Sequence, residues 1–164
     1  MALATPLAIG ETQQDAPTAA GRRFIIGLLW FGAVATAAYW TIWFGVDRQW
    51  LATTHTPAYY AFENAFVLSD AWMAVTGVLA AVALHRHKAS ALLWMLLTGS
   101  ASIYLAGMDI LFDVENGIYV HGDPASVAVE AFINVTCLAG GAAVIVFAWR
   151  HRQHFMTLAS KEQR

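Results

Sequence analysis

Four carboxylic acids lie inside long apolar segments of this chain: Glu63, Asp70, Asp109 and Glu130. An ionised carboxylate at the centre of a membrane costs about 2.5–3.5 kcal/mol even on permissive insertion scales, so such a group faces the protein interior and is protonated, paired or bathed by water. Buried carboxyls of this kind serve as general acids, proton carriers or cation ligands. These four residues are therefore the predicted catalytic set.

Helical spacing places these acids on faces shared with other polar and small residues. Glu63 and Asp70 are seven residues apart, which is two helical turns on one face. Small residues on such faces let membrane helices approach closely. We expect an outward-facing acidic pocket that is closed at its cytoplasmic end by Gly and Ala packing. In the last two apolar segments, the residues that recur at steps of three and four are Thr98, Ser102, Ala106, Asp109 and Asp113, then Glu130, Asn134, Cys137 and Gly141.

Three of the acids are expected to converge, although they belong to three different segments. Glu63, Asp109 and Glu130 lie at depths that agree within about 3 Å at a rise of about 1.5 Å per residue. Like charges in one pocket cannot all ionise, so at least one carboxyl is expected to be protonated, with Asp70 near mid-span the first candidate. The alternative is that each acid only hydrogen-bonds to a neighbouring helix. The predicted ligand-binding neighbours are Asn64, Ser102, Asn134, Trp40 and Trp43.

The segments that carry the acids are long enough to cross a membrane. Of 164 residues, 59% are apolar and 12% charged, against about 45–50% and about 25% in soluble domains. The apolar residues gather in segments 24–46, 58–84, 90–112 and 125–149, each suited to a hydrocarbon core of about 30 Å. Lipid-exposed strands would alternate and close into a barrel, so these runs indicate helices. The predicted fold is an all-α polytopic membrane protein, an antiparallel four-transmembrane-helix bundle, and not a cytoplasmic enzyme, a nucleic-acid binder or a disordered chain.

The flanking segments predict the orientation. Residues 1–23 are expected to form a flexible cytoplasmic tail, and residues 150–164 a basic cytoplasmic tail. Eight of the nine Lys and Arg residues lie in these tails and in the second loop, so the positive-inside rule predicts a bacterial-type inner-membrane protein with both termini in the cytoplasm. Pro124 suits a first helical turn that is capped by the preceding Asp. Four further acids fall at the opposite surface and are expected to be solvated: Asp47, Asp113, Glu115 and Asp123.

Nothing in the sequence indicates a cofactor or a bound metal ion. Cys137 is the only cysteine, which excludes a disulfide within the chain. Both lysines lie outside the apolar segments, which excludes a retinal Schiff base, and no histidine lies near mid-membrane to hold a haem. Four histidines at the cytoplasmic flanks leave open a metal or haem-edge site, the alternative being that they are solvated: His85, His87, His151 and His154.

The acids at Asp47 and on the second segment resemble the layout of the sterol-isomerase-like four-helix family, the EXPERA domain. The resemblance is one of layout alone, because residues 62–66 and 112–117 match no motif of that family; it implies an isoprenoid or sterol ligand.

Two functions remain open from the residues themselves. The first is binding of a small amphiphilic or lipid-like ligand, with isomerase- or cyclase-type carboxyl chemistry if the protein is an enzyme. The second is a proton- or cation-linked transport unit, or an accessory subunit of a membrane complex without chemistry of its own. The expected partners are membrane lipids, the amphiphilic ligand and either further copies of the chain or a larger membrane complex, but not nucleic acid.

Overall fold

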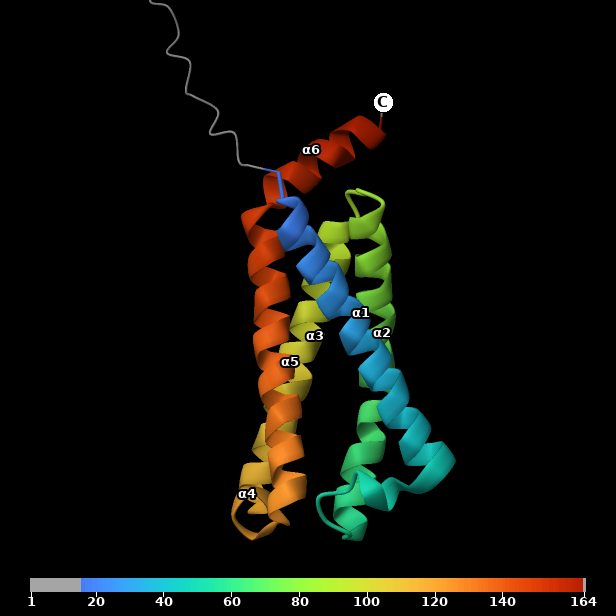
Figure 1. The fold of residues 1–164 in the computed structure, drawn as a ribbon, viewed down its shortest axis with the longest axis vertical. Coiled ribbons are helices and arrows are strands. Elements are labelled where there is room, and N and C mark those ends of the chain that lie inside the picture. The colour runs from blue at the N-terminus through green and yellow to red at the C-terminus, as the bar shows by residue number, and fades with distance from the viewer. Residues whose placement is uncertain (1–15, 164) are drawn as a thin grey trace, which may run out of the picture.

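The computed structural model describes residues 16–163, and these residues fold into helices joined by short turns (Figure 1). Four helices are long and apolar enough to cross a membrane, which confirms the predicted all-α fold and the class of a multi-pass membrane protein. They are α1 (Ala19–Ile42), α2 (Pro57–His85), α3 (Ala91–Glu115) and α5 (Pro124–Arg150). The shorter elements are a π-helical turn η1 (Trp43–Asp47), a 3-10 turn η2 (Arg48–Trp50), α4 (Ile118–His121) and α6 (Arg152–Glu162).

Polar side chains cap the first turns of three long helices, α1, α2 and α5. Thr18 Oγ1 accepts a hydrogen bond from the backbone N–H of Gly21 (3.1 Å), so α1 starts before the expected boundary and takes in part of the expected tail. Residues 1–15 of that tail lie outside the described residues. At α5, the Asp123 carboxylate accepts a hydrogen bond from the first helical turn (3.1 Å) and Pro124 opens the helix, as the sequence predicts.

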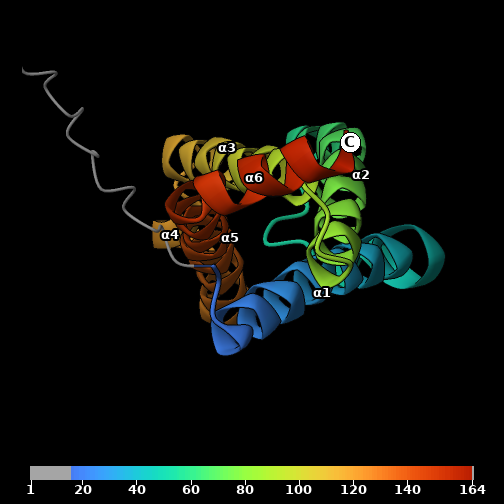
Figure 2. The ribbon, with the colours of Figure 1, turned by 90° about the horizontal axis from the view of Figure 1, so that it is seen from above.

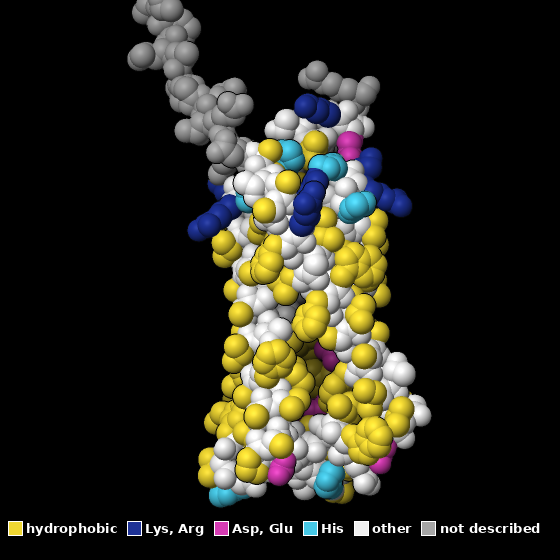
Figure 3. All heavy atoms as spheres, viewed as in Figure 1, with side chains coloured by type: hydrophobic (Ala, Val, Ile, Leu, Met, Phe, Trp, Pro, Cys, Tyr) yellow, Lys and Arg dark blue, Asp and Glu magenta, His cyan; other side chains and the backbone are white. Residues whose placement is uncertain are grey.

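The long helices pack in a simple order, α1 on α2, α2 on α3 and α3 on α5. Helices α1 and α5 are near each other at one end only, where a Cβ on Gly21 would lie 3.6 Å from the Phe147 ring, and they diverge toward the other end (Figure 1). Lys and Arg side chains gather at the first end (Figure 3). We call it the basic end and the opposite one, which holds η1 and α4, the acidic end. The described residues of the basic end are Arg22, Arg23, Arg86, Lys88, Arg150, Arg152 and Lys161.

Small residues close the bundle toward its basic end, as the sequence predicts. A Cβ on Gly99 of α3 would lie 2.8 Å from the carbonyl oxygen of Gly141 on α5, so the two backbones are in direct contact there. Alanines without exposed surface continue this packing on α2, α3 and α5: Ala80, Ala81, Ala91 and Ala148. Such close packing is a main source of helix association in lipid, because the hydrophobic effect does not drive helices together there.

The expected C-terminal tail is helical through most of its length. Helix α6 lies across the basic end of the bundle, as the view from above shows (Figure 2). Phe155 anchors it in the apolar core, and Lys88 Nζ lies 3.4 Å from a Glu162 carboxylate oxygen. The pattern of the last residues did not indicate this helix, because its mean hydropathy is low and only one of its side chains is fully buried.

Candidate functional site

A cavity of about 290 Å³ lies among the four long helices. Its lining begins beside Gly99 and Gly141 and continues to Glu63 and Glu130 near the acidic end. In the space-filling view, acidic side chains are visible inside a hollow between α5 and α1 (Figure 3). The cavity thus starts where the close packing of glycines ends.

Three predicted acids meet at this cavity, each from a different helix. Glu63 of α2, Asp109 of α3 and Glu130 of α5 each present a carboxylate oxygen, and these three oxygens lie within 4.8 Å of one another. We call these residues the acid triad. Their convergence confirms the geometry that the matched depths in the sequence predict; the catalytic role of the residues stays a prediction.

Neutral donors hold two members of the acid triad in place. The Tyr39 hydroxyl of α1 donates to Glu63 Oε2 (2.9 Å), and the Thr53 hydroxyl donates to Glu130 Oε2 (3.0 Å). Thr53 belongs to the loop before α2, and its backbone N–H donates to the hydroxyl of Tyr59, a buried residue of the first α2 turns (3.4 Å). The loop therefore folds back over the triad. Neither Tyr39 nor Thr53 was singled out from the sequence.

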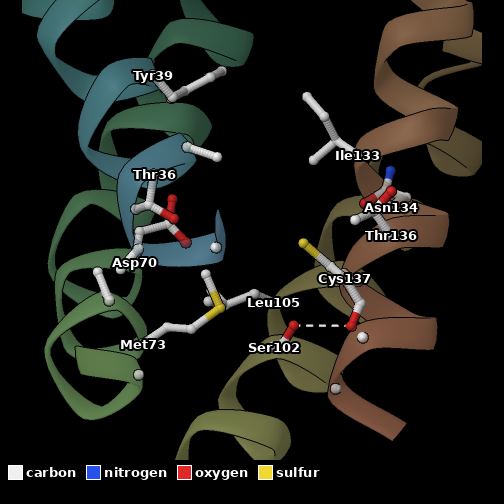
Figure 4. A pocket seen from close by; sticks show the side chains of 18 of the residues that line it. Thr36, Tyr39, Asp70, Met73, Ser102, Leu105, Ile133, Asn134, Thr136 and Cys137 are labelled. Carbon is white, nitrogen blue, oxygen red and sulfur yellow. Dashed lines mark hydrogen bonds between the residues drawn. The ribbon is translucent and has the colours of Figure 1, made fainter. Parts of the chain in front are cut away.

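Asp70 lies on the same cavity wall but apart from the acid triad. It is two turns from Glu63 toward the basic end, and the indole N–H of Trp40 donates to its Oδ2 (3.0 Å). In the close-up view, Asp70 stands near Thr36 and Met73, opposite Asn134 and Cys137 (Figure 4). The four predicted acids thus form a group of three and one separate carboxyl.

Two predicted ligand-binding residues line the cavity with their polar groups already engaged. The Ser102 hydroxyl donates to the backbone carbonyl of Cys137 (2.8 Å), which ties α3 to α5 (Figure 4). The Asn134 side chain is buried, and its Nδ2 donates to the Tyr119 hydroxyl (3.3 Å).

The other predicted ligand-binding residues join α1 and η1 to α2. Trp43 is buried and its indole N–H donates to Asn64 Oδ1 (2.9 Å). Trp43, Asn64 and Trp40 are not among the residues that line the cavity. Their part in ligand binding stays a prediction. In the structure, Tyr39 and Trp40 of α1 and Trp43 of η1 form a row of aromatic donors that hydrogen-bond to polar groups of α2.

Comparison of the chain with protein-family models, with curated proteins and with solved structures finds no match. The chemistry of the site follows from its own residues. Among the residues that the structure describes, no Lys, Arg or His lines the cavity, so its four carboxyls face hydroxyl, amide and thiol groups and no cationic side chain. The arrangement suits proton donation or the binding of a positively charged group.

Asp113 corrects the expectation that this acid is solvated at the surface. Its side chain is only 1% exposed, and its Oδ2 has no hydrogen-bond partner among the described residues. Because it follows Asp109 by one helical turn, it faces the same seam between α3 and α5. Partial burial, together with the neighbouring Asp113 carboxyl, raises the pKa of Tyr119 to about 12. The signal was present in the sequence, since Asp113 continues the polar series of its helix.

The histidines of the flanks belong to the basic end. The Arg22 guanidinium donates to His87 Nδ1 (2.8 Å), and partial burial, then His151 and His87, lower the pKa of His154. Within the described part of the chain, the one group of three side chains close enough to share a metal ion is the acid triad, and it contains no histidine.

Proposed function

We propose that the chain is a multi-pass protein of a bacterial-type inner membrane, with both termini in the cytoplasm, and that its cavity binds a small amphiphilic ligand. Of the nine Lys and Arg residues, seven lie at the basic end, Arg48 lies at the acidic end, and Arg164 is outside the described residues. This asymmetry supports the orientation. The acid triad then lies in the outer half of the membrane. The observation that carries the proposal is a cavity with an apolar wall and carboxyls at one end.

Entry is proposed to be lateral, from the lipid between α1 and α5. Phe31 on α1 and Val129 and Phe132 on α5 line the cavity, and more than half of each side chain is exposed. Residues that line the cavity and are also exposed on the outer surface mark an opening of the cavity. This opening, the mouth, faces the acyl chains of the lipid. The hollow between α5 and α1 lies at this mouth (Figure 3). An apolar tail can therefore stay in lipid while a polar head reaches Glu63 or Asp70.

The head group that this site favours is a cation or a hydrogen-bond donor. Four carboxyls line the cavity, and each of Glu63, Asp70 and Glu130 accepts a bond from a neutral donor, which leaves further acceptor positions free. If the ligand is a substrate, a protonated carboxyl supplies the acid of an isomerase- or cyclase-type reaction. The acid/base step is the finer part of the proposal and depends on the binding step.

Photolabelling of the purified protein tests the binding step. A hexadecylamine that carries a diazirine in its chain is added to the protein in detergent, and labelled peptides are found by mass spectrometry. We expect label near Val129 and Phe132 on α5. Ile133→Trp, which fills the mouth, should remove it, whereas Leu68→Trp on the lipid-facing side of α2 should not.

Label spread evenly over all exposed helices, or label that the substitution at Ile133 leaves unchanged, would contradict lateral binding. A second variant, Asp70→Asn, keeps an acceptor for the Trp40 indole and removes the ionisable group. It should preserve the fold and weaken capture of the amine, and native mass spectrometry of the untreated protein reports any lipid that purifies with it.

A further inference from the structure

The spacing of the acid triad matches the coordination sphere of one metal ion. The carboxylate oxygens of Glu63, Asp109 and Glu130 all lie within 4.8 Å of one another. Two oxygens bound to one ion at about 2.4 Å can be at most about 4.8 Å apart, and calcium binds oxygens at about 2.3–2.6 Å. Three helices thus place three oxygens where one ion can contact all of them.

A fourth acid, Asp113, lies buried next to the acid triad with one carboxylate oxygen that has no hydrogen-bond partner among the described residues. Its side chain is 1% exposed, and the unpartnered oxygen is Oδ2. Asp113 follows Asp109 by one helical turn, so it lies on the same face of α3, the helix that packs against α5. A buried carboxylate oxygen without a donor carries its full desolvation cost. A cation at the triad offsets that cost for all four acids together.

In the described part of the chain, no Lys, Arg or His side chain lines the cavity beside these acids. The one ion pair among the described residues joins Lys88 to Glu162 at the basic end. Arg48, the basic residue at the acidic end, lies over the ring of Tyr60, 4.2 Å from its centroid. The acids are therefore neutralised by protons, by a ligand or by a metal ion.

We infer that the acid triad is a site for a hard divalent cation such as Ca²⁺ or Mn²⁺, with Asp113 beside it. All-carboxylate sites suit hard ions such as these, whereas zinc and copper sites are more often built with nitrogen and sulfur ligands. Tyr39 and Thr53 hold the Glu63 and Glu130 carboxyls by hydrogen bonds, as outer partners do in metal sites. The inference goes beyond the proposed function, because an ion can bind here while the rest of the cavity is empty.

Titration with Mn²⁺ tests the site without any amphiphile present. The full chain, purified in detergent and freed of metal with a chelator that is then removed, is titrated with Mn²⁺, and free ion is read by electron paramagnetic resonance. We expect one saturable site that Ca²⁺ displaces. Asp109→Asn should weaken Mn²⁺ binding at least about tenfold, whereas Glu115→Gln, at an exposed acid of the same helix, should change it less than about twofold.

The absence of a saturable Mn²⁺ site, or a site of equal affinity in both variants, would overturn the inference. Thr53→Val gives a second variant if Asp109→Asn does not fold, because it removes only the donor to Glu130 and should weaken binding about tenfold or more. Failure of this titration leaves the labelling by hexadecylamine intact, and failure of the labelling leaves the titration intact.

Discussion

Gly99→Ala tests the contact that holds α3 against α5. The added Cβ would lie 2.8 Å from the Gly141 carbonyl oxygen and 2.7 Å from Ile145 Cγ1, while ordinary contact begins at 3.4 Å. The side chain of Ile145 can turn aside, but the carbonyl belongs to a helix backbone. The two helices must therefore separate by several tenths of an ångström along the seam. Overpacking of this kind costs about 1–3 kcal/mol.

Gly107→Ala on the same helix is the matched control. An added Cβ meets nothing within 4 Å there, and both substitutions gain the same helix preference of about 1 kcal/mol. The difference between the two variants isolates the packing cost, so Gly99→Ala should be the less stable by about 1–3 kcal/mol, a factor of about 5 or more in the unfolding constant.

The assay is reversible unfolding in mixed micelles of a mild detergent and dodecyl sulfate, followed by tryptophan fluorescence. Equal unfolding midpoints for Gly99→Ala and Gly107→Ala would refute the argument that a glycine contact closes the bundle. The same separation moves Asp109 away from Glu130, since they lie on the two helices concerned. Mn²⁺ affinity should fall in the first variant and not in the second.

Three further predictions concern orientation, capping and pH. In a Cys137→Ala background, a cysteine at Thr54 should react with an impermeant maleimide on intact cells and one at His87 should not; the reverse pattern would invert the orientation. Asp123→Ala removes the cap of α5 and should lower stability by about 1 kcal/mol in a chemical melt, and no change would exclude the cap. The pKa of His154 is depressed below 6.5, so the unfolded state binds more protons, and docking of α6 should be stable above about pH 6.5 and weaken as the pH falls through the folded value. Hydrogen-exchange protection of α6, taken relative to the intrinsic exchange rate at each pH, that does not change with pH, or that changes equally in His154→Gln, would contradict this.

The sequence predicts the helices and the convergence of the acid triad because both depend on local rules. Apolar length marks a spanning helix, and equal depth with a shared small-residue face aligns acids from separate segments. Glu63, Asp109 and Glu130 satisfy both rules. The Gly and Ala packing of the basic end is predicted from the small residues on the helix faces that carry these acids.

The hydrogen-bond partners of the acids depend on tertiary contacts, which the spacing of residues along a helix does not predict. Thr53 reaches Glu130 because a loop folds back over the cavity, and no pattern within the loop indicates its path. Asp113 sits at a helix end, where distance from the apolar centre suggests water, but its side chain is buried, and Tyr119 of the following α4 lies beside it. Phe155 is the one fully buried side chain of α6, and a single buried side chain is too weak a pattern to define a helix.

The row of aromatic donors on α1 and η1 has a consequence for the order in which the chain is assembled. Tyr39, Trp40 and Trp43 satisfy Glu63, Asp70 and Asn64 within the first helical hairpin. This hairpin can therefore enter the bilayer during synthesis with its polar groups already bonded, before the second half of the chain exists. Glu130 arrives last, and its bond comes from Thr53 of the finished hairpin. The cavity is thus completed only when α5 has been made, and a chain that ends before α5 lacks Glu130 and one wall of the cavity.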